Sequence, residues 1–566
     1  MRRRHFGDLR RAFGGLHSRA GKAGAVIAPT DEIRSLTNAP PEGNLGRKFM
    51  NLRLFQTAVA FVAIASLAPS AKAADKRFMS TPRDTNIYSR PASREDLRPL
   101  ATPKLPAFIA SMLVVDPVVN NIDPTLLMSS TFGFRGEISI AAVQSSLDSN
   151  IGNKIVLTDF EEQWGATAPL WLSTNGGTTW SKNFAINAPP GDPGAVGCPC
   201  DQTVDFNPLT GALAGVFLTN DAIFSALSSK LTISPGAFNY FAVGGVAQKV
   251  NHLVAGSDPD QPWLLTGGKP GAVKKSENVY VAYDDFNGAP DMRVAVAAAG
   301  SGPLQFTIDN RSGFSGGAIN PGHRLAIDQN SGAVYSLFQR SLGAGAGGSK
   351  NIDYMLNRST DGGQTWGLNG SPTGIVVANA DSTQPQPKFC TVNALLGGVD
   401  HAAVDPKTGD VVYVYGSRDP VTGNNRLAMR RLTSNGAGGL NIGPELFVTG
   451  QVQAAIPSVA ITTNRTIGVF FYTCDGTSFS GFPIITAHFS TSTDLGNNFF
   501  DNTLESFLSP AIDNGDSRQR VLGDYQQVKA IGNTFFGGFA GNRFGFHPAW
   551  PLSITDPVFF KVQIGG

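Results

Sequence analysis

The octapeptide STDGGQTW at residues 359–366 has two variant copies, STNGGTTW at 173–180 and STDLGNNF at 492–499. One copy replaces Asp by Asn, and the other replaces Trp by Phe. Each predicts the tip of a β-hairpin, because Asp or Asn caps backbone N–H groups and Gly adopts the positive φ that a tight turn needs. The final aromatic side chain is expected to fold back onto hydrophobic neighbours. The role of these residues is therefore structural.

Their shared pattern, S-x-D-x-G-x-T-W, resembles the Asp box of the bacterial neuraminidase repeat, which occurs in sialidase-like β-propellers. The resemblance implies an all-β propeller of four-stranded blades with the octapeptides at its periphery. Asp boxes are found in hydrolases, in lyases and in proteins without catalysis, so function has to be argued from other residues.

Residues 50–73 have the layout of a secretory signal peptide. A basic Arg53 precedes an apolar run from about Ala58 to Ala68, and an A-x-A cleavage site ends at Ala73. Met50 is then the expected start, with residues 1–49 an upstream extension; the alternative is that the arginine-rich residues 1–49 form a basic arm or targeting segment. No later apolar run is long enough to span a bilayer. We expect a secreted or periplasmic protein without a transmembrane segment in the mature chain.

Removal of residues 1–73 changes the charge. The full chain carries +2, whereas residues 74–566 hold 33 Lys+Arg and 39 Asp+Glu, a net charge of −6. A mildly acidic, glycine-rich chain is a poor candidate for nucleic-acid binding. Its apolar residues occur in short runs, which is typical of a folded all-β protein.

Four cysteines remain in this chain, which is expected to reach an oxidising compartment. Cys198 and Cys200 are too close to pair easily, so we expect one or two long-range disulfides from this pair to Cys390 and Cys474. A thiolate metal site is the alternative, although C-x-C lacks zinc-ribbon spacing.

From Arg135 onward the chain repeats an apolar strand, a turn of the form D/N-P-x-T-G, and a strand rich in Val, Tyr and Phe. Seven such units, about 60 to 80 residues apart, predict seven propeller blades over residues 135–566; six blades are the alternative. The octapeptides then fall in blades one, four and six. Residues 74–134 are an extended lead-in, in which the strand at 111–115 can complete the last blade and close the ring.

Propeller geometry selects one face for chemistry, because inner strands start and second strands end on the same side. Ionisable residues at the inner-strand starts are Arg135, Glu137, Asp201, Asp258, Asp260, His323, Arg324, Asp400, His401, Asp524 and Tyr525. Those just after second strands are Asp159, Glu161, Glu162, Asp221, Asp284, Asp285, Arg340, Arg418, Asp419, Asp475 and Arg543. A single member often caps a turn or forms a solvated ion pair, but the whole set predicts a polar ligand site.

Three functions remain open for this face. For a sialidase-like hydrolase the resemblance implies that Asp159 is the acid/base and Tyr525 the nucleophile, with Arg135, Arg324, Arg418 and Arg543 as candidate members of the carboxylate clamp. Against this, the motif F/Y-R-I-P is incomplete at Arg135, and the Glu partner of the tyrosine is not placed.

The second function is a polysaccharide lyase, in which His323 or His401 takes a proton while Arg324 neutralises charge. The third is a propeller that binds an extracellular glycan or a protein and catalyses nothing. In each case Asp201, Asp400 and Asp524 are expected to bind substrate. No cofactor is indicated; acidic pairs such as Asp258 with Asp260 offer oxygen ligands to Ca²⁺ but lack EF-hand-like spacing, so no metal is assigned.

Overall fold

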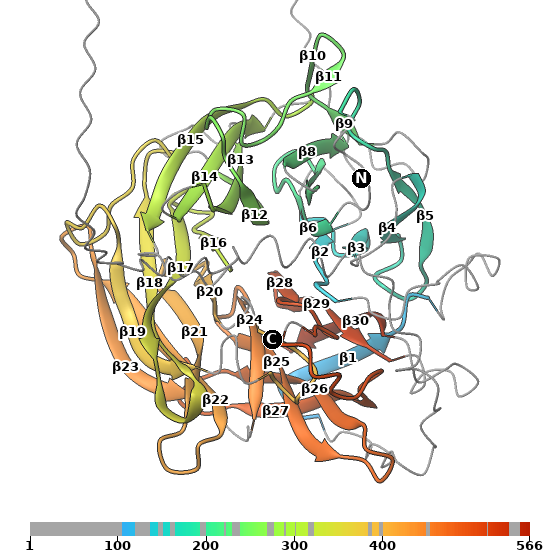
Figure 1. The fold of residues 1–566 in the computed structure, drawn as a ribbon, viewed down its shortest axis with the longest axis vertical. Helices are drawn as coiled ribbons and strands as arrows, with labels where there is room; N and C mark the ends of the chain where they lie inside the picture. The colour runs from blue at the N-terminus through green and yellow to red at the C-terminus, as the bar shows by residue number, and fades with distance from the viewer. Residues whose placement is uncertain are drawn as a thin grey trace, which may run out of the picture. The chain divides into compact units, whose positions relative to one another are not determined.

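The computed structural model describes residues 105–118, 136–144, 151–158, 165–192, 200–219, 222–228, 238–268, 277–287, 290–299, 302–314, 322–382, 388–395, 400–448, 453–517, 519–542 and 555–565. The chain divides into units 1–67 and 68–566, and every described residue belongs to the second. This second unit is an all-β, seven-bladed propeller of four-stranded antiparallel sheets (Figure 1). The predicted fold class and the count of seven blades are confirmed.

Each of the first six blades uses four consecutive strands, ordered from the innermost to the outermost. Blade 1 contains β2 (Ile140–Ala142), β3 (Ile155–Thr158), β4 (Gly165–Ser173) and β5 (Ser181–Ile186); blade 2 contains β6 (Cys200–Phe206), β7 (Leu213–Leu218), β8 (Ile223–Ser228) and β9 (Asn239–Tyr240); blade 3 contains β12 (Pro259–Gly268), β13 (Glu277–Asp285), β14 (Asp291–Ala299) and β15 (Phe306–Phe314). Blade 4 contains β16 (Arg324–Ile327), β17 (Val334–Ala344), β18 (Lys350–Ser359) and β19 (Ile375–Ser382); blade 5 contains β20 (Asp400–Val404), β21 (Val411–Arg418), β22 (Asn425–Ser434) and β23 (Leu440–Phe447); blade 6 contains β24 (Ala454–Ile461), β25 (Ile467–Thr477), β26 (Pro483–Ser492) and β27 (Phe500–Leu508).

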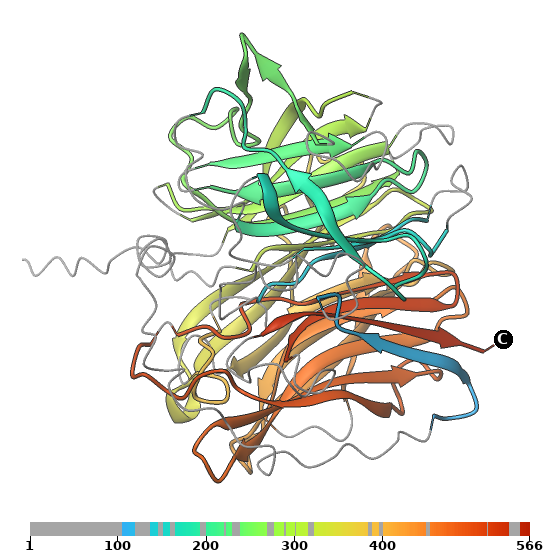
Figure 2. The same cartoon turned by 90° about the vertical axis from the view of Figure 1, so that its right-hand side faces the viewer.

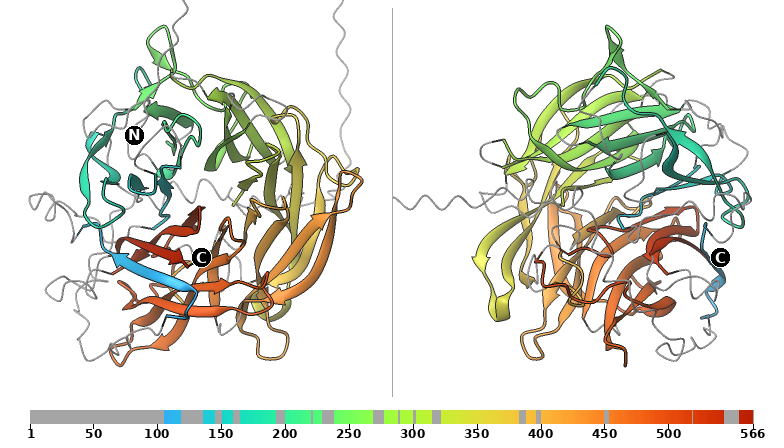
Figure 3. Two further views of the ribbon diagram at one scale, coloured as in Figure 1. Left: turned by 180° about the vertical axis from the view of Figure 1, so that it is seen from behind. Right: turned by 45° about the vertical axis from the view of Figure 1, so that its right-hand side comes forward.

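Blade 7 joins the two ends of the propeller. Its inner three strands are β28 (Gln527–Ile531), β29 (Thr534–Gly541) and β30 (Asp556–Ile564), and its outer strand is β1 (Ile109–Val115). β1 pairs with β30 in antiparallel register, with Val115 opposite Phe559; the two strands lie side by side in Figure 3, β1 in blue and β30 in red. Each innermost strand lies against the next around the ring, and β28 lies against β2. The ring is therefore closed both at its centre and in its last sheet.

Outside the blades, a short hairpin of β10 (Ala242–Val243) and β11 (Val246–Ala247) projects beyond blade 2, as Figure 2 shows at its top. A 3₁₀ turn, η4 (Ala346–Gly348), lies between β17 and β18.

The turns between first and second strands repeat one geometry. The Oδ1 atom of Asn207 accepts hydrogen bonds from the backbone N–H groups of Leu209 and Thr210 at 3.0 and 2.7 Å. Asp405 accepts in the same way from Lys407 at 2.9 Å. The glycine that ends each turn has positive φ, 71° at Gly211 and 74° at Gly409, which costs a residue without Cβ little. The D/N-P-x-T-G signal thus marks true turns of inner hairpins.

The three octapeptides form matching hairpins between the third and fourth strands of blades 1, 4 and 6, as predicted. In the copy at 359–366, Ser359 Oγ donates to Asp361 Oδ1 at 2.8 Å and accepts from Gly363 N at 2.8 Å. Asp361 Oδ1 also accepts from Thr365 N at 2.9 Å. Asn175 and Asp494 repeat the last bond with Thr179 N and Asn498 N. The Asn and Phe variants therefore keep the same turn.

Each octapeptide also contacts the preceding blade. The Trp180 ring packs edge-on against Phe559 of β30, with ring centroids 5.2 Å apart. Trp366 shares a buried cluster with Tyr280 and Val296 of blade 3. Phe499 packs against the cluster that contains Met429 of blade 5. Because neighbouring blades are separate sheets, such side-chain packing helps to hold them together.

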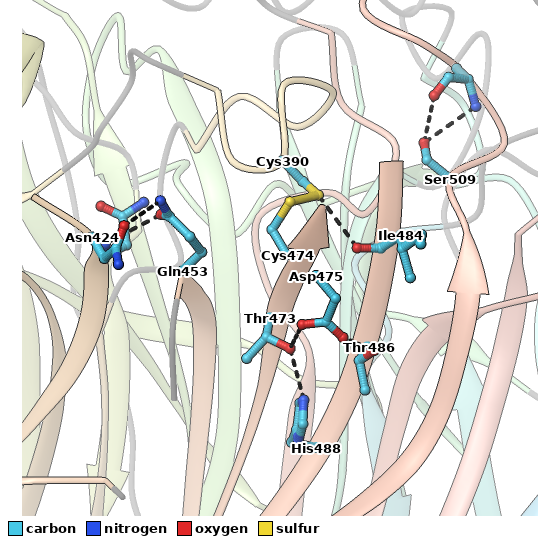
Figure 4. The surroundings of a disulfide bond; sticks show 12 residues. Cys390, Asn424, Gln453, Thr473, Cys474, Asp475, Ile484, Thr486, His488 and Ser509 are labelled. Atoms are coloured by element: carbon cyan, nitrogen blue, oxygen red, sulfur yellow. Dashed lines mark hydrogen bonds between the residues drawn. A yellow bond between two sulfur atoms is a disulfide. The ribbon is translucent and has the colours of Figure 1, made fainter. Parts of the chain in front are cut away.

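The disulfide prediction was wrong. Cys390, in the segment between blades 4 and 5, is bonded to Cys474 on β25, with Cα atoms 5.3 Å apart (Figure 4). Neither can then pair with Cys198 or Cys200, whose side chains lie outside the described residues. The curvature of the ring brings a loop and a strand 84 positions apart into contact, and cysteine spacing carries no signal of that. Nearby, Asp475 accepts hydrogen bonds from the hydroxyls of Thr473 and Thr486.

Removal of this disulfide, as in Cys390→Ser with Cys474→Ser, should lower the free energy of unfolding by about 2–4 kcal/mol. The loop it closes is long, so its loss returns substantial entropy to the unfolded chain. Urea unfolding of oxidised native protein beside the double variant measures the difference. Equal unfolding midpoints would contradict this expectation.

Candidate active site

A group of charged and polar side chains gathers where inner strands start, on the predicted face. We call it the strand-start cluster; it consists of Glu137, Asp201, Asp260, Gln261, Asp284, Arg324, Arg520 and Asp524. Its members come from the segments at the starts of β2, β6, β12, β16 and β28 and from the end of β13. All are at most 9% exposed. A low-dielectric site with this many ionisable groups needs close pairing of charges.

Backbone geometry at the junction of blades 1 and 7 brings two cluster members together. A Cβ added to Gly136 would lie 2.5 Å from the backbone of Leu522, so only glycine permits this approach. Glu137 N donates to Leu522 O at 3.2 Å, and Asp524 N donates to Glu137 Oε1 at 3.2 Å. The strand starts of the first and last blades thus share one carboxylate.

Three cluster residues adopt left-handed backbone conformations, with φ of 59° at Glu137, 43° at Asp201 and 47° at Gln261. Such conformations cost non-glycine residues on the order of 1 kcal/mol or more, and they concentrate at functional sites. Each lies at or near an inner-strand start. This repeated strain supports a functional role for the cluster.

Arg520 holds the centre of the cluster. Its Nη2 atom donates to Asp524 Oδ2 at 2.7 Å and also to Glu137 Oε1. The amide of Gln261 donates to the same Asp524 Oδ2, and its Oε1 accepts from Arg324 Nη2 at 3.3 Å. A continuous hydrogen-bonded chain therefore runs from Glu137 to Arg324 across blades 1, 7, 3 and 4.

Arg324 lies in an aromatic setting. Its guanidinium carbon is 4.6 Å from the Trp263 ring centroid and 5.0 Å from that of Tyr525. The two rings meet edge-on at 5.4 Å. The hydroxyl of Tyr525 donates to Gln202 O at 3.0 Å. Cation–π contact in a buried site stabilises the arginine and fixes its orientation.

Two carboxyl groups of the cluster hold their protons more tightly than usual. The pKa of Asp284 rises to about 8, mainly because the group is buried; the Gly322 N–H bond and Arg324 oppose the rise, and the Asp260 charge adds to it. Burial also raises the pKa of Asp201, reinforced by Glu137 and Asp260. Within the described residues, Asp284 Oδ1 has no hydrogen-bond partner. Asp284 is therefore a buried acid that keeps its proton at neutral pH and has a free oxygen.

Asp260 and Asp284 are direct cross-strand partners on β12 and β13. The Cβ atoms of such partners are roughly 4.5–5.5 Å apart, and their side chains lie on the same side of the sheet. One protonated carboxyl group thus stands beside a second one. This arrangement can donate a proton and stabilise a positive charge at the same place.

The structure brings together some of the sequence-predicted residues. Asp201, Arg324, Asp524 and Tyr525 all belong to the cluster or contact it. Asp400 lies near Arg324 but accepts from Gln339 Nε2 at 2.6 Å and from the Tyr413 hydroxyl, which gives it a structural role. Arg418, at the end of β21, lies beside Gly347 and Gly423 instead. Arg135, Asp159 and Arg543 lie outside the described residues.

The two predicted histidines have different surroundings. His323 Nε2 lies 2.7 Å from Ser336 Oγ of blade 4 and 3.2 Å from Ser312 Oγ of blade 3, so the ring sits between these two blades. His401 Nδ1 accepts from Val459 N at 3.2 Å, and its ring meets Trp263 at 5.7 Å. Burial lowers the pKa of each to about 3. Both are therefore neutral imidazoles and weak bases.

The sequence pattern did not identify Arg520, Gln261 and Trp263. Arg520 stands four residues before Asp524, in a segment that the repeat does not cover. Gln261 and Trp263 lie in β12 just after Asp260, and the search for ionisable residues at strand starts passed over them. The sequence signal that could have found Arg520 is a charged residue shortly before β28, the last inner strand.

Among described residues, no group of three or more His, Cys, Asp or Glu is arranged to hold a metal ion. The described part of the chain likewise contains no helix long and apolar enough to cross a membrane.

No protein-family model and no curated protein sequence matches the chain. The similarity to the Asp box therefore stays a resemblance. Solved structures with a similar fold include the polysaccharide lyase Uly1, at 10% identity and a TM-score of 0.43 over 81% of this chain and 99% of that one. The GH93 α-L-arabinofuranosidase of Fusarium graminearum, in complex with arabinobiose, has 14% identity and a TM-score of 0.38 over 64% and 93%.

A third similar structure is the Penicillium chrysogenum α-L-arabinanase complexed with arabinobiose, at 12% identity and a TM-score of 0.36 over 75% and 93% of the two chains. All three scores are low. The fold assignment accordingly rests on the sheet topology of this chain.

Asp284 should make stability depend on pH. Its pKa rises from the usual 3.8 to about 8 in the folded state, so the folded protein binds this proton more tightly than the unfolded chain. The contribution of this proton to the free energy of unfolding is complete below about pH 4 and is lost as the pH rises toward 8. In Asp284→Asn, the free energy of unfolding should therefore fall less steeply over this range, by up to about 1.4 kcal/mol per pH unit.

Urea unfolding at pH 5, 6, 7 and 8 measures the slope for the native protein and the variant. Asp381→Asn is the matched control, because hydrogen bonds from Asn351 and Ala346 lower the pKa of Asp381 and leave nothing to titrate in this range. An Asp284→Asn slope equal to the native one would refute the assignment.

Proposed function

We propose that this protein is a carbohydrate-active hydrolase that cleaves a glycosidic bond at the strand-start cluster. The observation that carries the proposal is the cross-strand pair Asp260 and Asp284, in which Asp284 stays protonated at neutral pH. Glycoside hydrolysis typically uses two carboxyl groups, one as acid and one as base or nucleophile. Burial keeps Asp284 protonated at neutral pH, which suits it to the role of the acid.

In this proposal Asp284 donates its proton to the leaving-group oxygen. Asp260, as the carboxylate, stabilises or attacks the anomeric carbon. Retaining enzymes hold their two carboxyl groups close together, about 5–5.5 Å apart. Because Asp260 and Asp284 are direct cross-strand neighbours, we assign the pair to the retaining class. Arg324 is fixed between the rings of Trp263 and Tyr525. Its guanidinium offers a cation to the sugar, and the two rings offer flat aromatic surfaces.

The sialidase form of this proposal has less support. It needs three arginines on one carboxylate and a tyrosine nucleophile paired with a glutamate. Arg324 lies beside Tyr525, but Arg520 is bonded to Glu137 and Asp524, and Arg418 lies elsewhere. The Tyr525 hydroxyl donates to a backbone carbonyl, and burial raises its pKa. We therefore assign catalysis to the carboxyl pair.

A lyase mechanism has less support still. His401 Nδ1 already accepts a backbone N–H, so Nε2 carries the proton and has no lone pair for a substrate. His323 is enclosed by two serines. Neither imidazole is placed or tuned as a general base.

A second candidate function, glycan binding without catalysis, is favoured by one observation. Asp260 and Asp284 are 2% and 1% exposed, and the hydrogen-bonded chain from Glu137 to Arg324 pairs many of its own charges. Substrate must gain access to the pair for hydrolysis, whereas binding at the face needs no such access. Under either function, an extracellular location rests on the expected signal peptide at residues 50–73.

The test is hydrolysis of a panel of fluorogenic glycosides and plant and microbial oligosaccharides, including a sialoside, by the expected mature chain, residues 74–566. Native protein should release product from one sugar class. Asp284→Asn and Asp260→Asn should each lower kcat by about 10²-fold or more, because each removes one arm of acid–base catalysis. Rates should also fall as the pH rises through about 8, where Asp284 loses its proton.

The control is Asp381→Asn, which removes a carboxylate on an outer strand and should retain full activity. Saturable retention on a glycan array without product would favour the binding function. Product formation that both cluster variants retain would refute the assigned roles. Release of an unsaturated, ultraviolet-absorbing product from a uronate polymer would show that the reaction is an elimination and not a hydrolysis.

A further inference from the structure

A cavity of about 400 Å³ lies among the inner strands of the propeller, apart from the carboxyl pair. All seven inner strands contribute to its wall, and so do Gln329, Pro406, Thr463 and Gly532, which follow inner strands β16, β20, β24 and β28. The cavity therefore reaches toward the ends of these strands, while the strand-start cluster lies at their beginnings. Its volume is within the range of about 300–1,000 Å³ found for small-molecule sites.

The wall is mainly apolar along β16, β20 and β24, with His401 near the start of β20, and it is more polar across the ring. β16, β20 and β24 contribute small aliphatic residues, among them Ala326, Ala403, Val404, Ala460 and Ile461. Across the ring, β28 contributes Lys529, β6 contributes Asp205, and Gln144 follows β2. This division suits a small molecule with a compact apolar part and one polar group.

Lys529 is a charged residue on inner strand β28 of blade 7, and its side chain reaches β6 of blade 2. It donates to Asp205 Oδ1 and, at 3.2 Å, to Val204 O. Asp205 Oδ2 is occupied by Thr266, which donates its N–H at 2.8 Å and its hydroxyl at 3.0 Å. An ammonium has three protons. Within the described residues, one Lys529 proton is left without an acceptor, while both oxygens of Asp205 are in use.

His401 adds a second donor to the cavity wall. Because Nδ1 accepts the Val459 N–H, Nε2 carries the ring proton, and no described residue accepts it. Besides burial, the positive charges of Arg324 and Lys529 lower the pKa of His401, so both cations lie near this imidazole. The cavity thus has unused donor protons on Lys529 and His401, whereas both oxygens of Asp205, the carboxylate in its wall, already accept hydrogen bonds.

We propose that this cavity is a binding site for a small organic carboxylate with a compact aliphatic part. Its carboxylate accepts from Lys529 and His401, and its aliphatic part packs on the small residues of β20 and β24. This inference does not rest on the proposed hydrolase function, because no residue of the carboxyl pair takes part.

The probe is isobutyrate, with isobutyramide as its uncharged counterpart of the same shape. Isothermal titration calorimetry on residues 74–566 should give saturable, one-site binding of isobutyrate. The amide should bind about ten-fold or more weakly, since a charge-assisted hydrogen bond is replaced by a neutral one. Equal affinity for acid and amide would overturn the proposal, and so would no heat from either.

Two variants locate the binding. Lys529→Gln removes the ammonium and should weaken isobutyrate binding about ten-fold or more. Ala403→Leu fills part of the cavity without touching the ion pair and should abolish binding while the protein melts cooperatively. If Lys529→Gln does not fold, the Ala403→Leu result decides. Unchanged affinity in folded Ala403→Leu would place the ligand elsewhere and refute the site.

Discussion

The closing contact between blades 7 and 1 is the constraint on which the rest of this structure depends. A propeller is stable only when its last blade meets its first, and β1 completes the sheet of β28, β29 and β30 at the periphery. At the centre, Gly136 approaches the backbone of Leu522 so closely that Glu137 and Asp524 share Arg520. Closure therefore brings charges into a buried site.

That site follows from packing as much as from chemistry. The side chains of the strand-start cluster are almost fully buried, so each ionisable group there needs a partner or must become neutral. Arg520 pairs with Glu137 and Asp524, whereas Asp284 avoids the cost of burial by keeping its proton. The same ring of strand starts therefore holds carboxyl groups in two settings, one beside an arginine and one protonated.

Much of the fold could be predicted from sequence, because its signals are local. The octapeptide turns, the D/N-P-x-T-G turns and the strands between them each depend on a few neighbouring residues, and their spacing gives the blade count. Inner-strand starts followed from that count, which is why Asp201, Arg324, Asp524 and Tyr525 were found.

What the sequence could not supply depends on contacts across the ring. Cys390 meets Cys474 only because blades curve, and Arg520 joins the site through a segment outside the repeat. Lys529 looks like any charged residue in a strand until Asp205 is found opposite it. Arg418 has the right position in its blade but extends toward Gly347 and Gly423, a direction that strand periodicity alone does not fix.

The central claim is that Asp260 and Asp284 act as a closely spaced carboxyl pair on a glycoside. The most direct measurement is the anomeric configuration of the first product, followed by proton NMR during hydrolysis of the best substrate in the panel. With the two carboxyl groups acting as cross-strand neighbours in a retaining pair, the configuration of the substrate should be kept in the sugar first released. Release of the inverted anomer would contradict this account, as would a folded protein that hydrolyses no glycoside.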